Sequence, residues 1–314
     1  MRKLLLTLVT MIVAISPSWA RSKKSANNQG TNSQIENTAA EKKEPNIYTV
    51  ILMSNLDGYE FTTSGKIGEH AYVDLELPSG LYWATCNIGA KLPMEAGDFF
   101  AWGETEKKSE YNWKSYKWAE ITETGQRTDA NGEKKSVYKK TQTKYCANSQ
   151  PGKKQSKADI DTLRTLLPED DAATAQWGDS WRMPTLAEIE ELIKGCDWLW
   201  VPNYNKTGVA GIMGNSRKNG NTIFFPAAGF MYNQSLNNVG DFGAYWSSNL
   251  EVNPDVMQNL FNPSARSMGF YFGTSAPGRA WVRSNWDDRM FGMLVRAVSL
   301  PKKEGEASSD NKKE

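Results

Sequence analysis

Residues 180–195 read SWRMPTLAEIEELIKG and carry the clearest helix signal in the chain. Thr185, followed three positions later by Glu188, is a capping box, in which each side chain satisfies a backbone N–H of the first turn. The apolar residues that follow fall on one face of a helix: Leu186, Ile189, Leu192 and Ile193. Gly195 is a typical C-cap, so the sequence predicts a helix here that buries one face.

Two shorter stretches upstream have helical features. Glu169–Gln176 begins with acidic residues, which the helix dipole favours, and ends before Gly178. Ile160–Leu167 has apolar residues at a helical spacing, but Pro168 limits its length. We expect a second helix over the first stretch and a short helical segment over the other.

The rest of the folded part predicts short strands between Asn- and Gly-containing turns. The expected strands are Tyr48–Met53, Leu81–Thr85, Thr222–Pro226, Phe230–Tyr232, Ala244–Ser248, Met268–Phe272, Ala280–Arg283 and Met293–Ser299. One or two helices on an antiparallel sheet make an α+β fold. The chain has 12 Trp and 25 Gly, which is typical of loop-rich folds with ring-filled cores. A Lys-rich stretch over 105–155 is interpreted as an inserted loop, a place for partner specificity.

The first 20 residues have the three parts of a secretory signal peptide. Arg2 and Lys3 precede an apolar run over 4–15, and Ser18 and Ala20 suit cleavage after residue 20. The apolar run is 12 residues long, whereas a membrane-spanning helix needs about 20. We therefore expect export to the periplasm, the outer surface or the medium, with no transmembrane span after cleavage. The alternative is an uncleaved anchor.

The sequence beyond the predicted cleavage site divides by composition. We expect a disordered linker over 21–46, an N-terminal strand element over 47–67, a folded domain over 68–299 and a disordered charged tail over 300–314. Arg21, not Cys, follows the cleavage site, so the chain is not expected to be a Cys-anchored lipoprotein. Removing Arg2 and Lys3 changes the formal net charge from +1 to −1. A near-neutral chain has no bulk attraction for nucleic acid, so no nucleic-acid partner is expected.

Eight ordered strings in the folded domain resemble a known family. They are VDLELPSGL (73–81), WATCNIGA (83–90), GDFFAWGET (97–105), PEDDAA (168–173), SWRMPT (180–185), FPAAG (225–229), YWSS (245–248) and VRAV (295–298). In this order they resemble the Fibrobacter succinogenes major paralogous domain over about residues 68–299. That family is common in secreted and surface proteins of Bacteroidota and has no established activity.

The resemblance also implies a fold. The helix start with Trp181, Arg182 and Pro184, the strand with Trp246 and the final strand with Arg296 resemble C-type-lectin-like and sulfatase-modifying-factor-like domains. Such domains combine two helices with a twisted antiparallel sheet and long irregular loops. The resemblance implies structural roles for these five residues, through ion pairs or backbone hydrogen bonds for the two arginines. Fold alone does not give function.

Histidine and cysteine chemistry is limited in this chain. His70 is the only histidine, so a multi-His metal site is excluded and an ordinary structural role is favoured. Cys86, Cys146 and Cys196 lack zinc spacing. Export permits one disulfide with one thiol left over, and three free thiols are the alternative.

Carboxylates gather in two places, Glu169–Asp170–Asp171 and Asp287–Asp288. Oxygen clusters of this kind can hold Ca²⁺, which takes about six to eight oxygen ligands. The alternatives are charge at a helix N-terminus for the first cluster and a solvated turn for the second. A glycosidase would need two carboxylates that face each other across a cleft.

Tryptophan side chains supply the candidate ligand platform. Trp113 and Trp118 lie in the Lys-rich stretch, while Trp281 and Trp286 flank Arg283. Exposed indoles can stack on sugar rings, and core packing is the alternative for each of them.

These features favour a secreted or cell-surface binding module whose partner is a glycan or a protein. One alternative is a carboxylate-dependent enzyme that acts on carbohydrate or on a sulfated polymer. Another is a structural component of an envelope or fibre assembly, which would show an uncovered sheet edge or a large apolar patch.

Overall fold

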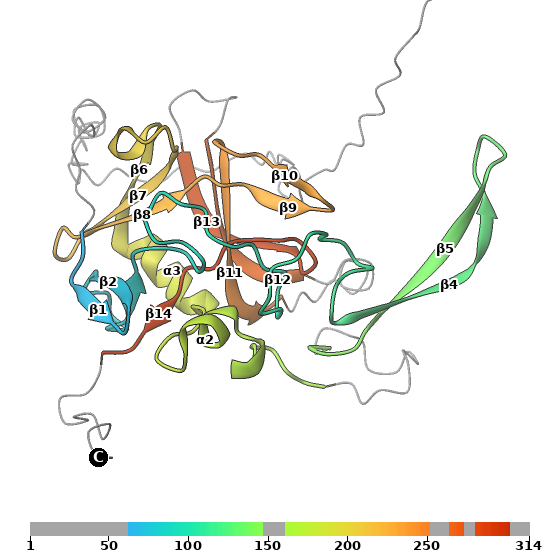
Figure 1. Cartoon of the computed structure of the whole chain (residues 1–314), viewed down its shortest axis with the longest axis horizontal. Helices are drawn as coiled ribbons and strands as arrows, with labels where there is room; N and C mark the ends of the chain where they lie inside the picture. Colours follow the sequence, from blue (N-terminus) through green and yellow to red (C-terminus); the bar gives the residue numbers. More distant parts are fainter. Residues whose placement is uncertain (1–61, 147–160, 252–263, 273–279, 302–314) are drawn as a thin grey trace, which may run out of the picture. The chain divides into compact units, whose positions relative to one another are not determined.

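The computed structural model describes residues 62–146, 161–251, 264–272 and 280–301. The predicted signal peptide, the linker, the strand at Tyr48–Met53 and most of the charged tail lie outside these residues. The described residues form mostly antiparallel sheets with two α-helices, in agreement with an α+β fold (Figure 1).

The predicted helix is confirmed as α3, Leu186–Gly195. The Thr185 side chain accepts from the Glu188 backbone N–H at 3.3 Å, and the Glu188 carboxylate accepts from the Thr185 N–H at 2.7 Å. Gly195 is the last helical residue rather than the cap. A Cβ there would lie 2.4 Å from the Leu77 side chain, so glycine permits this close approach.

The two motif arginines hold separate parts of the fold. Arg182 makes a bidentate ion pair with Glu188, at 2.8 and 2.6 Å, which fixes the start of α3. Arg296 is fully buried and donates to the Asn87 side chain at 2.8 Å and to the Phe224 carbonyl at 3.0 Å. These contacts fit the structural roles that the resemblance implies.

The three largest sheets share one apolar core with α3. The three-stranded sheet β11-β12-β13 packs against it and consists of β11 (Phe242–Leu250), β12 (Ser264–Phe272) and β13 (Ala280–Asp288). The second has the order β6-β7-β8, with β6 (Cys196–Val201), β7 (Gly211–Ser216) and β8 (Thr222–Pro226). The third has the order β1-β2-β3-β14, with β1 (Gly65–Ile67), β2 (His70–Asp74), β3 (Tyr82–Ala84) and β14 (Val298–Ser299). Because β1 pairs with β2, the described end of the predicted N-terminal element shares a sheet with the folded domain.

Large rings contribute much of the core. Trp83, Trp102, Trp181 and Trp246 are all fully buried. Buried indoles normally need an acceptor for their N–H, and three of these find one across the fold. Trp181 donates to the Ile67 carbonyl at 3.4 Å. Trp102 donates to the Ser247 carbonyl at 2.9 Å, and Trp246 donates to the Phe100 carbonyl at 2.8 Å. Pro184 is the remaining one of the five motif residues, and its carbonyl accepts from the Ser248 N–H at 2.8 Å.

Two predicted elements differ in the structure. Helix α2 covers only Ala172–Trp177, after the short 3-10 helix η3 (Pro168–Asp170). The predicted segment Ile160–Leu167 is wrong in its described part. There the Leu166 N–H donates to the Ser248 carbonyl at 2.9 Å, so contacts with β11 override the local helical spacing.

The predicted strand Met293–Ser299 is also only partly correct. Regular pairing is confined to β14, because the preceding residues each meet a different neighbour. Met293 bridges to Phe100, and Leu294 bridges to Tyr245.

The expected Lys-rich loop over 105–155 is wrong over 119–142, where the chain forms a β-hairpin. Strand β4 (Ala119–Thr128) pairs with β5 (Lys134–Gln142) and with no other described strand. The turn is closed by the Asp129 carboxylate, which accepts from the Asn131 and Glu133 N–H groups at 2.9 and 3.0 Å. We call this hairpin the arm; Figure 1 shows it extending away from the other sheets.

The remaining described elements are short. They are β9 (Phe230–Tyr232), β10 (Ser235–Asn237) and the 3-10 helix η4 (Tyr204–Lys206). In the described part of the chain, no helix is long and apolar enough to cross a bilayer.

Candidate functional site

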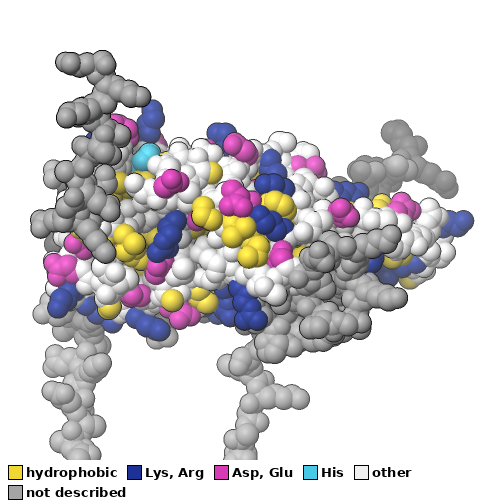
Figure 2. All heavy atoms as spheres, turned by 90° about the horizontal axis from the view of Figure 1, so that it is seen from below, with side chains coloured by type: hydrophobic (Ala, Val, Ile, Leu, Met, Phe, Trp, Pro, Cys, Tyr) yellow, Lys and Arg dark blue, Asp and Glu magenta, His cyan; other side chains and the backbone are white. Residues whose placement is uncertain are grey.

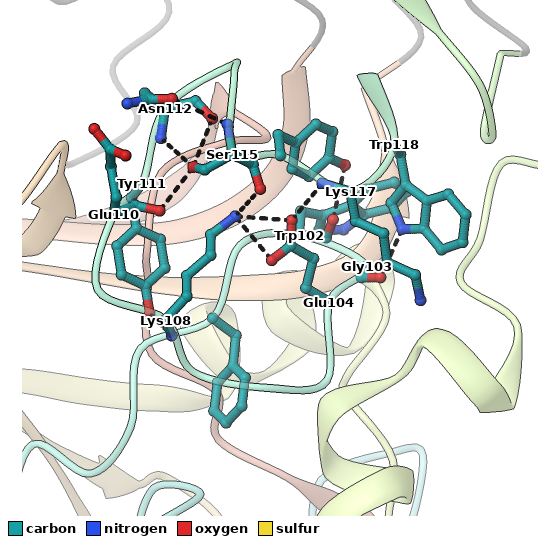
Figure 3. A network of polar contacts seen from close by, with 12 residues as sticks. Trp102, Gly103, Glu104, Lys108, Glu110, Tyr111, Asn112, Ser115, Lys117 and Trp118 are labelled. Carbon is teal, nitrogen blue, oxygen red and sulfur yellow. Dashed lines mark hydrogen bonds and ion pairs between the residues drawn. The ribbon is translucent and has the colours of Figure 1, made fainter. Parts of the chain in front are cut away.

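The segment just before the arm is an irregular loop with a charged centre. This loop, residues 99–118, is called the ring loop below because it carries seven aromatic residues. The Lys108 ammonium donates to the Glu104 carboxylate and to the Ser115 carbonyl, both at 2.9 Å (Figure 3). Glu104 also accepts from the Lys117 backbone N–H at 2.7 Å. The Lys108 and Glu104 side chains are only 19% and 9% exposed, so this ion pair closes the loop from inside.

Three rings of the ring loop are fixed by hydrogen bonds to its own backbone. Tyr111 donates to the Phe99 carbonyl at 2.5 Å, and Tyr116 donates to the Trp102 carbonyl at 2.8 Å. Burial raises the pKa of Tyr116, which keeps its hydroxyl protonated and able to donate.

Trp118 is held in the same way. Its indole N–H donates to the Gly103 carbonyl at 2.7 Å (Figure 3). Gly103 has a φ of +75°, and a Cβ there would lie 3.1 Å from the indole nitrogen, so glycine suits this position. The ring positions are therefore set before any ligand arrives.

Lysine ammonium groups lie over both candidate indoles of the ring loop. Lys140 of β5 lies 3.6 Å from the Trp113 ring centroid, and Trp113 also meets Tyr116 edge to face. Lys117 lies 4.2 Å from the Trp118 ring centroid. Both indoles are half-buried. Sequence reasoning selects these two tryptophans but misses Lys140, because a residue 27 positions away carries no local signal of this contact.

The four predicted tryptophans do not form one platform. Trp113 and Trp118 share the ring loop, whereas Trp281 and Trp286 lie on β13. The pairing of β13 with β12 is regular over all nine residues, so neighbouring side chains alternate between sheet faces. Trp281 packs on Tyr271 at 5.3 Å, with Arg283 on the same face. Trp286 is on the opposite face, with Arg266 5.9 Å from its ring centroid.

The acidic pair at the end of β13 reaches the base of the arm. Asp287 accepts from Ser267 Oγ at 2.6 Å, and burial raises its pKa to about 6. Burial also raises the pKa of Asp288 to about 6, against the opposing charge of Lys140. Burial lowers the pKa of Lys140 to about 8. Strand alternation places the two carboxylates on opposite faces, so they do not converge on one pocket.

Arg289 joins the end of β13 to the end of β5. It is fully buried, donates to the Tyr145 carbonyl at 3.2 Å and donates to the Gln142 side chain. Sequence reasoning misses this residue, since nothing in its local pattern points to β5. The contacts fix the arm base against the sheet that carries Asp287 and Asp288.

The other acidic cluster is occupied by protein donors. Asp170 accepts from Lys144 at 2.5 Å and from the Tyr145 hydroxyl at 2.6 Å. Asp171 caps α2 by accepting from the Ala173 and Thr174 N–H groups. Glu169 is exposed, 3.8 Å from Lys144. Among the described residues, no three His, Cys, Asp or Glu side chains lie together as a metal-ion site would require, and calcium stays a prediction.

His70 and the cysteines have structural surroundings. His70 stacks on Trp177, with ring centroids 3.7 Å apart, and burial lowers its pKa. Cys86, Cys146 and Cys196 are all free thiols, and burial raises the pKa of each of them. Of the two alternatives left open by the sequence, the structure has three free thiols.

The charge on the surface is mixed. Figure 2 shows small groups of hydrophobic side chains between acidic and basic side chains on one face. A cavity bounded by Thr62, Tyr204 and Thr222 has a volume of about 10 Å³, enough for one water.

Comparisons with protein families, with curated proteins and with solved structures returned no match.

Proposed function

We propose that this chain is a secreted or cell-surface binding module of the kind it resembles, the Fibrobacter succinogenes major paralogous domain with a C-type-lectin-like fold. Its partner is a glycan or a protein, and the ring loop is its recognition surface. The observation that carries the proposal is that contacts set the positions of both candidate indoles. Trp118 is held by its bond to Gly103, and Trp113 packs between Lys140 and Tyr116. Preorganised aromatic side chains lose little conformational entropy on binding, which favours affinity.

The contacts of the ring loop favour a role in ligand binding over a purely structural role. Tyr111, Tyr116 and Trp118 use their polar ends on the loop's own backbone. Trp113 has no such bond to a described residue and stays half-buried between Lys140 and Tyr116. A half-buried ring flanked by an ammonium group suits a sugar with hydroxyl or acidic substituents, or an aromatic or acidic side chain of a protein.

The enzyme alternative has one supporting observation, the pKa values of about 6 at Asp287 and Asp288. Groups with such pKa values gather at catalytic sites. A paired-carboxylate mechanism, however, needs both groups on one cleft. Because these two side chains alternate across β13, each would need a different partner carboxylate.

A glycan array tests the proposal. The chain without residues 1–20 is applied with calcium and with EDTA, alongside Trp113→Ala, Trp118→Ala and, as a matched half-buried control, Trp177→Ala. We expect saturable binding that both ring-loop variants lose and the control keeps. Loss in EDTA would make the acidic clusters metal candidates. No binding under either condition would contradict the glycan version and leave a protein partner.

A further inference from the structure

A second pair of an aromatic ring and an ammonium group lies beside that of Trp113 and Lys140. The Lys114 ammonium of the ring loop lies 5.0 Å from the ring centroid of Tyr138 on β5. Tyr138 is 49% exposed, and Lys114 is exposed as well. Lys114 follows Trp113 in the ring loop, and Tyr138 precedes Lys140 by two residues in β5. The second pair therefore continues the candidate site from the ring loop onto the arm.

Both pairs lie on one face of the arm. Tyr138 faces Glu123 and Lys140 faces Ile121 across the hairpin, and the pairing between these positions is regular. Side chains two residues apart on a strand point to the same face, about 7 Å from each other, whereas Lys139 between them points to the opposite face. A ring and an ammonium group thus occur twice along this face. We call the four residues the ring–lysine strip: Trp113, Lys114, Tyr138 and Lys140.

Positive charge exceeds negative charge on this face of the arm. Lys134 lies on the same face of β5 as Lys140, and neither Lys134 nor Lys114 makes an ion pair with a residue that the structure describes. The opposing carboxylates are Asp288, whose charge opposes that of Lys140, and Glu123, which accepts a hydroxyl hydrogen bond at 2.7 Å within the arm. An ammonium group with no carboxylate partner has donors left for a ligand, so an anionic group is favoured here.

A sugar polymer with acidic groups fits the ring–lysine strip. An aromatic ring packs on the apolar side of a sugar ring, and an ammonium group donates charge-assisted hydrogen bonds to a carboxylate or a sulfate. Because the strip repeats both groups about 7 Å apart, it suits a chain in which a sugar ring and an acidic group also repeat. An acidic peptide carries the charge but has no apolar face at each acidic residue.

We propose that the ligand of the ring loop is an anionic polysaccharide with carboxylate or sulfate groups, which continues along the ring–lysine strip onto the arm. The inference rests on the proposed function and adds two residues to the site, Lys114 and Tyr138. Trp113 and Tyr138 contact sugar rings, while Lys114 and Lys140 contact the acidic groups.

Isothermal titration calorimetry of the chain without residues 1–20 tests the ligand class. Polygalacturonate and dextran sulfate are the carboxylate and sulfate probes, dextran is the neutral control, and polyglutamate is the acidic control without sugar. We expect one or both acidic polysaccharides to bind, more weakly at high salt because charges contribute. The probe that binds identifies the acidic group. Equal affinity for dextran would overturn the role of charge, and equal affinity for polyglutamate would overturn the role of the sugar.

Variants then locate the ligand on the strip. Lys114→Gln and Tyr138→Ala should each weaken binding of the acidic polysaccharide about fivefold. Lys139→Gln removes the same charge from the opposite face of β5 and should change the affinity by less than about twofold. Urea denaturation checks that all three variants fold. Equal losses for Lys114→Gln and Lys139→Gln, or no loss for both strip variants, would overturn the proposed path.

The two proposals can fail separately. Neutral glycans that bind on the array through Trp113 and Trp118, together with no binding of either acidic polysaccharide, would overturn the anionic ligand and leave the proposed function in place. No binding of any glycan, neutral or acidic, would overturn the glycan version of the proposed function and the anionic ligand with it.

Discussion

The ring loop and the arm are consecutive in sequence and opposite in structure. The ring loop has only isolated bridges, such as that of Tyr111 with Asn233, yet its polar groups are satisfied internally around a buried ion pair. The arm has regular β pairing, yet most of its side chains face solvent. Rigidity therefore follows burial and hydrogen bonding here, not regular secondary structure.

The largest expected difference in unfolding free energy between the ring loop and the arm comes from removing the charge of a lysine. Lys108→Met leaves the Glu104 carboxylate buried without its ammonium partner. We expect the free energy of unfolding to fall by about 2–3 kcal/mol, measured by urea denaturation. Lys139→Met, an exposed lysine of the arm, should change it by less than about 0.5 kcal/mol.

The double variant Glu104→Gln/Lys108→Met checks the cause. It removes both charges, and the Gln carbonyl can still accept from the Lys117 N–H, so most of the loss should be recovered. Equal losses of unfolding free energy for Lys108→Met and Lys139→Met would contradict a stabilising role for the buried ion pair of the ring loop.

The base of the arm should show a pH-dependent effect. Burial raises the pKa of Asp287 from 3.8 to about 6, so the folded state binds its proton more tightly than the unfolded state. The contribution of this carboxyl to stability is therefore present below about pH 4 and is lost as the pH rises through about 6. Asp287→Asn cannot ionise and should be more stable than the wild type at pH 8, by about 1–2 kcal/mol for this partly exposed group.

Thermal or urea unfolding of both proteins at pH 4 and pH 8 measures this difference. Near pH 4 the two proteins should be alike, because both side chains are then neutral in the folded state and Asn keeps an acceptor for Ser267. A difference of the same size at both pH values, or of opposite sign at pH 8, would contradict the role of burial.

Removing a single tyrosine hydroxyl should give a smaller difference in unfolding free energy between the ring loop and the arm. Tyr116→Phe removes the bond to the Trp102 carbonyl inside the ring loop and should lower the free energy of unfolding by about 1 kcal/mol. Tyr138→Phe on the arm, where the residue is 49% exposed, should leave it unchanged within error. Differential scanning calorimetry can compare the two variants directly. A loss at Tyr138 as large as that at Tyr116 would mean that the arm is covered in solution.

The predictability of these parts from sequence follows the range of their contacts. Helix α3 is predictable because its cap and apolar face lie within ten residues. The prediction for Ile160–Leu167 is wrong because pairing with β11, far along the chain, outweighs its local spacing. The arm is missed because its charged composition resembles a loop, although the Asp129–Gly132 turn gives a local signal for a hairpin.

In the candidate site, too, contacts between distant parts of the chain are the ones that the sequence does not predict. Trp113 and Trp118 lie on one segment, the ring loop, and their role in binding stays a prediction. Trp281 and Trp286 are grouped with them, but strand alternation separates those two across β13. Lys140 and Arg289 are not predicted, because their contacts with Trp113 and Gln142 arise only when β5 folds back against the end of β13.

The smallest expected effect comes from removing the outer arm altogether. Ile121 and Lys140 face each other across the hairpin, so an Asn-Gly pair in place of residues 122–139 closes them with a two-residue turn. The contacts of Lys140 with Trp113 and of Arg289 with Gln142 remain. The free energy of unfolding should change by less than about 0.5 kcal/mol. A loss of several kcal/mol would show that the outer arm contributes to the folded core.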